Sequence, residues 1–215
     1  MTQLHTSALQ RDDLDVNPNG SPFDAKKLND ALNVRKVGSI LGLVWPNVMK
    51  LDKWQQVFNE IHNATRSNNI PVLFGIDSIH AAGFIDGATF LPQPLSMAAS
   101  FSVEVAEKCG SIIAMEHRAT GSPWNFSPVL DAGRQPLWPR MYETMGEDGH
   151  LILKMSTAYI RGHHGGDQVN EYKNRKKAAT CLKHYVGYGI PFNGRDRSPA
   201  YVMIQIDSID LNNIF

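Results

Sequence analysis

The stretch IPVLFGIDSIH, residues 70–80, combines a short apolar run with a carboxylate at its end. Val72, Leu73 and Phe74 form a continuous hydrophobic segment, which is typical of a strand buried on both faces of a parallel sheet. Asp77 follows where the strand passes into its loop. Because α/β barrels carry their chemistry at the carboxyl ends of their strands, this position predicts a functional Asp77. The alternative is that Asp77 caps the following turn.

Three further apolar segments predict strands at residues 37–44, 124–130 and 178–185. Helices are expected between them, at residues 52–66, 102–119 and 148–160, because apolar residues recur there with helical spacing. Asp52 and Gln55 resemble a capping box at the start of the first helix. The residues expected on the inward faces of the three helices are Trp54, Val57, Phe58 and Ile61, then Val105, Cys109, Ile112 and Ile113, then Leu151, Ile152, Met155 and Tyr159.

Strands that alternate with helix-length segments predict βαβ units and a parallel sheet. We therefore predict an α/β fold, a parallel (β/α) barrel of the TIM type, with four βα units in this chain. An open doubly wound sheet is the alternative. No GxGxxG follows the first strand and no GxxxxGK[ST] occurs in the chain, so nucleotide binding is poorly supported.

The composition limits the partners that can be expected for this chain. The 215 residues are 42% hydrophobic and carry 21 basic and 21 acidic side chains, which gives a formal net charge of zero. That balance offers no electrostatic reason to expect nucleic acid or an anionic membrane as a partner. We expect no transmembrane segment and no secretory signal, and the compartment is left open. Cys109 and Cys181 have no CxxC spacing, so neither structural zinc nor a disulfide framework is expected.

Four longer blocks carry a family resemblance. They are PVLFGIDSIH (71–80), GATFLPQPLSMAASF (87–101), RATGSPWNFSPVLDAGRQPLWPRMYETMGED (118–148) and KHYVGYG (183–189). Together they are similar to the N-terminal barrel domain of glycoside hydrolase family 3, the β-glucosidase group, over about residues 37–199. The expected organisation is a polar, turn-rich lead at 1–36, a partial barrel domain at 37–200 and a divergent apolar tail at 201–215.

The resemblance implies four residues that bind the non-reducing glucose of a β-glucoside or oligosaccharide. They are Asp77 in the GID block, Arg140 at the end of the WPR block, and Lys183 with His184 in the KH block. Sugar hydroxyls both donate and accept hydrogen bonds, so carboxylates and cationic donors suit them. The resemblance implies no metal and no organic cofactor. Family members that cleave N-acetylglucosamine carry KHFPGHG at this point. This chain carries KHYVGYG instead, which favours a glucosidase-like ancestor.

Several alternatives remain open for polar residues near these blocks. Arg140 and Asp131 could form a structural ion pair, and Trp138 could stack on the sugar or belong to the core. The acids of residues 143–148 are expected to start a helix. His163 and His164 with Asp167 could hold a metal, although a doublet in a Gly-rich loop is usually at the surface.

The family pattern is incomplete in this chain. Retaining glycosidases use two carboxyl groups about 5 Å apart. The resemblance places the nucleophilic aspartate on a later strand and the acid/base beyond the barrel, and the chain ends before either. We therefore expect a truncated domain with no catalytic residue, or alternatively an inactive remnant or carbohydrate-binding fragment. Exposed strand edges also predict self-association.

Overall fold

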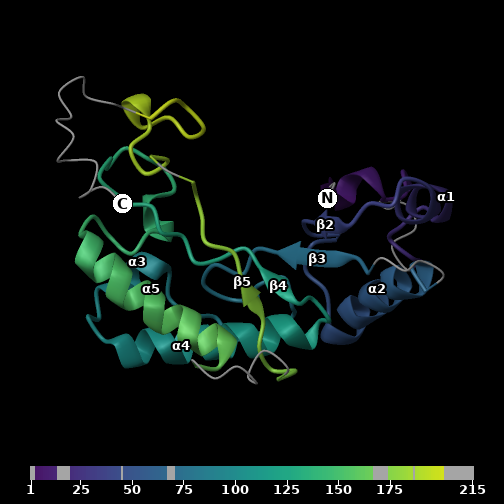
Figure 1. The fold of residues 1–215 in the computed structure, drawn as a ribbon, viewed down its shortest axis with the longest axis horizontal. Helices are drawn as coiled ribbons and strands as arrows, with labels where there is room; N and C mark the ends of the chain where they lie inside the picture. The colour runs from purple at the N-terminus through teal and green to yellow at the C-terminus, as the bar shows by residue number, and fades with distance from the viewer. Residues whose placement is uncertain are drawn as a thin grey trace.

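The computed structural model describes residues 3–13, 20–44, 46–66, 71–166, 174–185 and 187–200. Five strands form one parallel sheet in the order β1-β2-β3-β4-β5 (Figure 1). Their bounds are β1 Gln3–His5, β2 Ser39–Leu41, β3 Leu73–Ile76, β4 Trp124–Asn125 and β5 Ala179–Thr180. Each strand lies beside its predecessor, so the sheet winds in one direction as a barrel does, whereas a doubly wound sheet reverses its order. The predicted fold class is confirmed.

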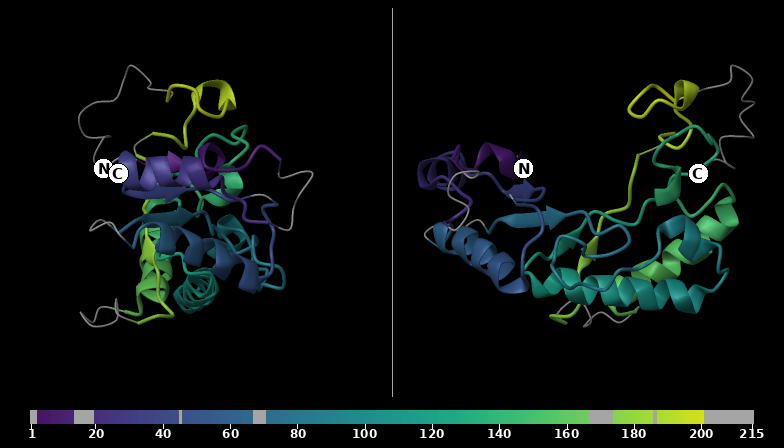
Figure 2. Two further views of the ribbon diagram at one scale, coloured as in Figure 1. Left: turned by 90° about the vertical axis from the view of Figure 1, so that its right-hand side faces the viewer. Right: turned by 180° about the vertical axis from the view of Figure 1, so that it is seen from behind.

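The long helices are gathered on one side of this sheet. Figures 1 and 2 show α2, α4 and α5 along one face, and none of these three covers the opposite face. Their bounds are α1 Ala25–Asn29, α2 Leu51–Ala64, α3 Pro94–Ala98, α4 Val103–Ala119 and α5 Gly149–His164, with a π-helical turn at Asp30–Val34 and 3₁₀ turns at Thr6–Ala8, Met141–Glu143 and Phe192–Gly194. No helix in the described ranges has the length and apolar character needed to span a bilayer.

The number of strands differs from the prediction. The four predicted strands are β2 to β5, and β1 lies within the segment expected to be a turn-rich lead. Residues 3–5 have no apolar run, so their sequence gives no strand signal. Pairing with β2 makes them a strand, with Leu4 opposite Ile40. The domain boundaries at residues 37 and 200 stay predictions, although β1 pairs with β2 across the first, and residues 201–215 lie outside the described ranges.

The predicted helix α2 is confirmed, but its capping box is wrong. Trp54, Val57 and Ile61 are buried on its inner face. The residue before the helix is Lys50, whose side chain makes no cap. The Gln55 side chain instead donates to the carbonyl of Ala119, at 3.1 Å between Nε2 and O. Its amide therefore ties α2 to the end of α4 rather than completing a cap.

Helices α4 and α5 begin where the sequence predicted and pack closely together. The side chains of Ser102 and Asp148 accept hydrogen bonds from the first turns, as N-cap residues do. A Cβ on Gly162 would lie 2.0 Å from the carbonyl oxygen of Glu107, so the glycine permits this close contact. Val105 is an exception to the predicted inward face, because it is 41% exposed on the outer side of α4.

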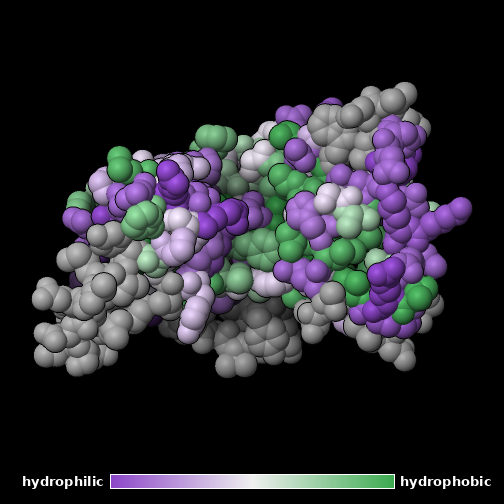
Figure 3. Space-filling view, turned by 90° about the horizontal axis from the view of Figure 1, so that it is seen from above, coloured by the Kyte–Doolittle hydropathy of each residue, from purple (hydrophilic) through white to green (hydrophobic). Residues whose placement is uncertain are grey.

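The uncovered face of the sheet is partly apolar. Leu41, Gly75 and Trp124 share this face, since they pair in register across β2, β3 and β4. The Phe126 ring lies over Gly75, where a Cβ would be 2.3 Å from its Cζ. Figure 3 looks onto this side of the molecule and shows hydrophobic residues gathered near its middle. The core proper lies on the other face, where Ile40, Phe74 and Ile76 are buried.

Candidate functional site

The carboxyl ends of three neighbouring strands bring the predicted polar residues together. Asp77 directly follows β3, and Lys183 lies shortly after β5. Beyond β4 the chain keeps its pairing through a parallel bridge between Val129 and Lys183, so that Asp131 reaches the same edge. The amide of Leu130 donates to the carbonyl of Lys183 at 2.6 Å. Backbone pairing therefore sets the positions of these side chains.

Asp77 and Lys183 form an ion pair between Oδ1 and Nζ. The Asp77 side chain is 56% exposed, whereas that of Lys183 is only 15% exposed. The lysine stem is thus packed while its ammonium binds the carboxylate. An exposed carboxylate can accept further hydrogen bonds, so this pair can also contact the hydroxyls of a ligand.

His184 binds the buried carboxylate of Asp131. The distance between Nδ1 and Oδ2 is 2.7 Å, and the backbone amide of His184 donates to the same oxygen at 3.2 Å. A carboxylate acceptor at this distance places a proton on Nδ1. Nε2 lies 3.4 Å from Nη2 of Arg140. His184 thus connects the buried acid to the guanidinium.

Arg140 is held by Glu143, which is only 6% exposed. Nε and Nη2 donate to the two carboxylate oxygens at 2.9 and 2.6 Å, a bidentate arrangement. This hydrogen bonding raises the pKa of the Arg140 guanidinium further above its ordinary value, so the group is permanently charged. The alternative of an ion pair between Arg140 and Asp131 is wrong, because each residue has another partner.

Tyr188 and Asp196 support this cluster from the segment after β5. The Tyr188 hydroxyl donates to Asp196 at 2.7 Å, and its ring lies 4.5 Å from that of His184. Trp138 donates to the same carboxylate at 3.0 Å. These donors lower the pKa of the Asp196 carboxyl below its ordinary value. Trp138 is 2% exposed, so it belongs to the core rather than to a sugar-stacking wall.

The four predicted residues thus form one set of contacts. Asp77 binds Lys183, the next residue is His184, and His184 lies against Arg140. Glu143 was expected at a helix start but binds Arg140 from a 3₁₀ turn, and no sequence pattern predicted a role for Tyr188. The spacing of Arg140 and Glu143, three residues apart, is a signal for such a pair. Asp148 does start α5 as expected.

The histidine doublet does not form a metal site in the part of the chain that the structure describes. His163 is fully buried, and its Nε2 lies 2.9 Å from the Asn125 side chain, so the expected surface position is wrong. Burial lowers the pKa of His163 to about 3. His164 contacts Thr180, and Asp167 lies outside the described ranges. No group of three or more metal-ligating side chains occurs within those ranges.

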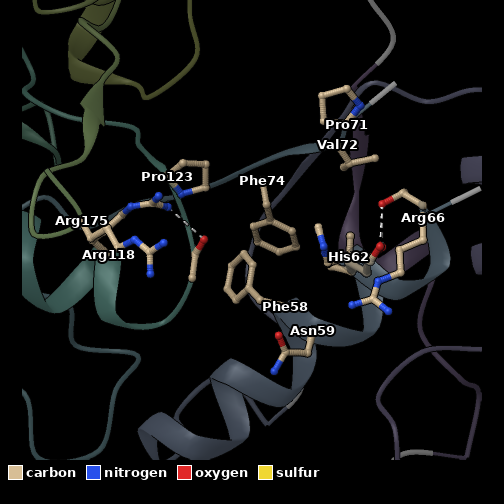
Figure 4. Close-up of a pocket in the computed structure, with 13 residues that line it drawn as sticks. Phe58, Asn59, His62, Arg66, Pro71, Val72, Phe74, Arg118, Pro123 and Arg175 are labelled. Atoms are coloured by element: carbon tan, nitrogen blue, oxygen red, sulfur yellow. Dashed lines mark hydrogen bonds between the residues drawn. The ribbon is translucent and has the colours of Figure 1, made fainter. Parts of the chain in front are cut away.

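A large cleft lies at the opposite end of β3 from Asp77 (Figure 4). Its volume is about 870 Å³, and Phe58 and Phe74 form its apolar floor. Arginines line the sides, and Arg118 donates to the carbonyl of Gly121 at 3.3 Å. None of the four predicted site residues lines this cleft. It is therefore separate from the cluster at the carboxyl edge of the sheet.

The comparisons with known proteins connect most of the chain to one family. The family described as the glycosyl hydrolase family 3 N terminal domain matches residues 9–212. A lysosomal β-glucosidase of Dictyostelium discoideum is 34% identical over 209 residues, which are 94% of this chain and 25% of that protein. The chain thus spans about a quarter of this relative.

Two solved structures are similar as well. A β-glucosidase involved in saponin metabolism from intestinal bacteria is 34% identical with a TM-score of 0.68, covering 80% of this chain and 21% of that one. An exo-1,3/1,4-β-glucanase from a Pseudoalteromonas species has a TM-score of 0.79 at 23% identity, covering 99% of this chain and 25% of that one. At this lower identity the likeness concerns the fold.

Proposed function

The chain belongs to the glycosyl hydrolase family 3 N-terminal domain family, and from this premise we propose that it supplies the sugar-binding part of a glycoside hydrolase acting on β-glucosides. The similarity to proteins named β-glucosidases supports this substrate class. Asp77, Arg140, Lys183 and His184 contact the glucose at the non-reducing end. Neither a metal nor an organic cofactor takes part in this binding.

The observation that carries the proposal is the connected set of four side chains at the carboxyl edge of the sheet. It offers an exposed carboxylate acceptor in Asp77, ammonium donors in Lys183 and a guanidinium in Arg140. Neighbouring sugar hydroxyls need both kinds of partner at fixed separations. A site with such polar groups rejects ligands that leave them unpaired, which gives selectivity for a particular sugar.

The same contacts favour binding over bond cleavage for these residues. Asp77, Asp131 and Glu143 each bind a lysine, histidine or arginine side chain. A retaining glycosidase needs one carboxyl group that attacks the sugar and one that donates a proton to the leaving group, whereas these three are engaged with cationic side chains. We therefore assign the nucleophile and the acid/base of a retaining reaction to carboxyl groups outside this set.

A second candidate is carbohydrate binding without hydrolysis, which the paired state of these carboxylates also favours. The two candidates differ in one measurement. A hydrolase releases nitrophenol from p-nitrophenyl β-glucoside, whereas a binding protein holds glucose and leaves this substrate intact. Because this chain is expected to hold no catalytic residue, glucose binding without release is expected of it under both candidates, and release of nitrophenol would exclude the second.

The experiment on the site itself is a calorimetric titration with glucose. Asp77→Asn removes the charge and keeps the shape, so we expect glucose affinity to fall at least tenfold. Asp52→Asn, on the exposed face of α2, is the matched control and should bind as the unaltered protein does. Equal affinity in the Asp77 variant and its control would remove Asp77 from the site.

A further inference from the structure

The Asn125 side chain binds the backbone next to the exposed carboxylate of Asp77. It is the last residue of β4, it is fully buried, and it lies opposite Ile76 in the sheet. Its Oδ1 accepts the backbone N–H of Ser78 at 2.8 Å, and its Nδ2 donates to the backbone carbonyl of Ser78 at 3.2 Å. Both backbone groups of the residue after Asp77 are therefore bound by one side chain.

The orientation of the Asn125 side-chain amide is itself fixed by other buried side chains. The two hydrogens of Nδ2 are shared among Ser127 Oγ at 2.7 Å, His163 Nε2 at 2.9 Å and the Ser78 carbonyl. The Tyr159 hydroxyl lies 3.0 Å from Ser127 Oγ. These acceptors face the NH₂ group, and the Ser78 N–H faces the oxygen, so the partners define the orientation of the amide. Burial keeps His163 neutral, so one ring nitrogen is an acceptor, and the neighbouring Asn125 NH₂ group assigns that role to Nε2.

Ser78 is also held through its side chain. Its Oγ lies 2.8 Å from Nδ1 of His117, and Nε2 of His117 lies 2.9 Å from Ser122 Oγ. Ser78, His117 and Ser122 are all fully buried. The result is an exposed carboxylate at position 77 on a backbone that is fixed at position 78. This contrast would be unexpected for an ordinary surface loop, whose backbone polar groups face water.

We propose that Asn125 is a positioning residue for sugar binding. It acts through Ser78 to hold Asp77 in one orientation, with His163 and Tyr159 holding Asn125 in turn. This inference rests on the proposed function, in which Asp77 contacts glucose. Binding groups held in place by buried hydrogen bonds lose less conformational freedom when the ligand arrives, so the ligand binds more tightly.

The first test combines Asn125→Ala with two readouts below the unfolding temperature. Three-bond NMR couplings report the side-chain torsion of Asp77, and calorimetry reports the dissociation constant for glucose. We expect couplings averaged over several rotamers and a dissociation constant raised about tenfold. If Asn125→Ala does not fold, Asn125→Ser is used instead. The serine hydroxyl still fits among Ser127 and His163, but the shorter side chain does not reach the backbone of Ser78.

Thr6→Ala is the matched control. Thr6 is also fully buried, and its Oγ1 donates to the carbonyl of Leu43 at 2.6 Å. Its loss removes a buried hydrogen bond that involves neither Ser78 nor the residues that hold it. We expect lower thermal stability in this variant, with the Asp77 torsion and the glucose affinity unchanged. An equal loss of affinity in both variants would overturn the proposal, because stability alone would then explain it.

A double variant separates positioning from general effects. If Asn125 acts through Asp77, adding Asn125→Ala to Asp77→Asn should weaken glucose binding no further. Independent, additive losses would overturn the proposal. If the unaltered protein binds no glucose, the proposed function fails, and the Asp77 torsion alone then decides the inference. A single unchanged rotamer in the Asn125 variant would overturn it.

Discussion

The Lys183 ammonium binds the Asp77 carboxylate although 106 residues separate the two along the chain. The contact exists because β3 and β5 end at the same edge of a parallel sheet, with β4 between them. Lys183 is mostly covered while Asp77 is exposed, so the lysine is the fixed partner. The pair therefore presents one ordered carboxylate to solvent.

Replacing this lysine should affect ligand binding more than folding. In Lys183→Met the stem is kept and the charge is removed. A partly exposed ion pair contributes about 0–1 kcal/mol to stability, so the melting temperature should change by less than about 4 °C. We expect glucose affinity to fall at least tenfold in calorimetry. Lys154→Met, on the exposed side of α5, serves as the control and should leave the affinity unchanged.

Glu143→Gln should destabilise the fold. The Arg140 guanidinium, whose side chain is only 19% exposed, would lose its bidentate carboxylate, and an uncompensated charge that is largely covered is costly. We expect a loss of about 2–4 kcal/mol in the free energy of unfolding, measured by urea denaturation. Glu147→Gln, at an exposed position four residues further on, should change it by less than about 0.5 kcal/mol. Similar midpoints for both variants would contradict the pairing.

Acid should destabilise the protein through its buried histidines. Burial lowers the pKa of His163 to about 3 and that of His117 to about 4, from an ordinary value of 6.5. The unfolded chain therefore binds protons that the folded chain excludes, and stability is lost as the pH falls from about 6.5 towards 4. Each histidine contributes a slope of at most about 1.4 kcal/mol per pH unit.

Urea denaturation at several pH values measures this slope. His163→Gln removes one of the two titrating groups, so its stability should depend less steeply on pH between 4 and 6.5. His150→Gln is the control, because His150 is exposed at the start of α5. The control should keep the steep dependence of the unaltered protein. A slope in His163→Gln equal to that of the control would show that His163 does not exclude protons.

The contact between α4 and α5 should not tolerate a methyl group at Gly162. An added Cβ would meet the carbonyl oxygen of Glu107 at 2.0 Å, so the helices must separate. We expect Gly162→Ala to lower the free energy of unfolding by about 1–3 kcal/mol despite the better helix propensity of alanine. Gly149→Ala in the same helix meets no atom within 4 Å and should be neutral or stabilising.

The sheet also predicts self-association of the 215-residue chain. Within the described residues β1 and β5 each pair with one strand only, and one face of the sheet is covered by none of the long helices α2, α4 and α5. Exposed strand edges and apolar faces favour contacts between copies. We expect a concentration-dependent increase of mass in sedimentation equilibrium. A constant monomer mass up to about 100 μM, in the range where exposed strand edges drive aggregation, would contradict this prediction.

The order of the local elements was largely readable from the chain. Helical spacing located α2, α4 and α5, since one face of each must be buried, and the residues Ser102 and Asp148 indicated two helix starts. Apolar runs located β2 to β5 but not β1. The three residues of β1 form a strand because they pair with β2, and their sequence contains no apolar run. The capping box failed since the Gln55 amide finds a tertiary partner.

For the site, the motifs supplied residue types and the tertiary structure supplied partners. The sequence by itself determined that Asp77, Lys183 and His184 lie at or near the ends of strand segments, because apolar runs locate strands, whereas Arg140 was implied by the family resemblance. Only the fold decided that Glu143 binds Arg140, that Asp131 binds His184 and that Asn125 holds Ser78. Such pairings depend on distances between segments far apart in the chain, which burial and strand register set together.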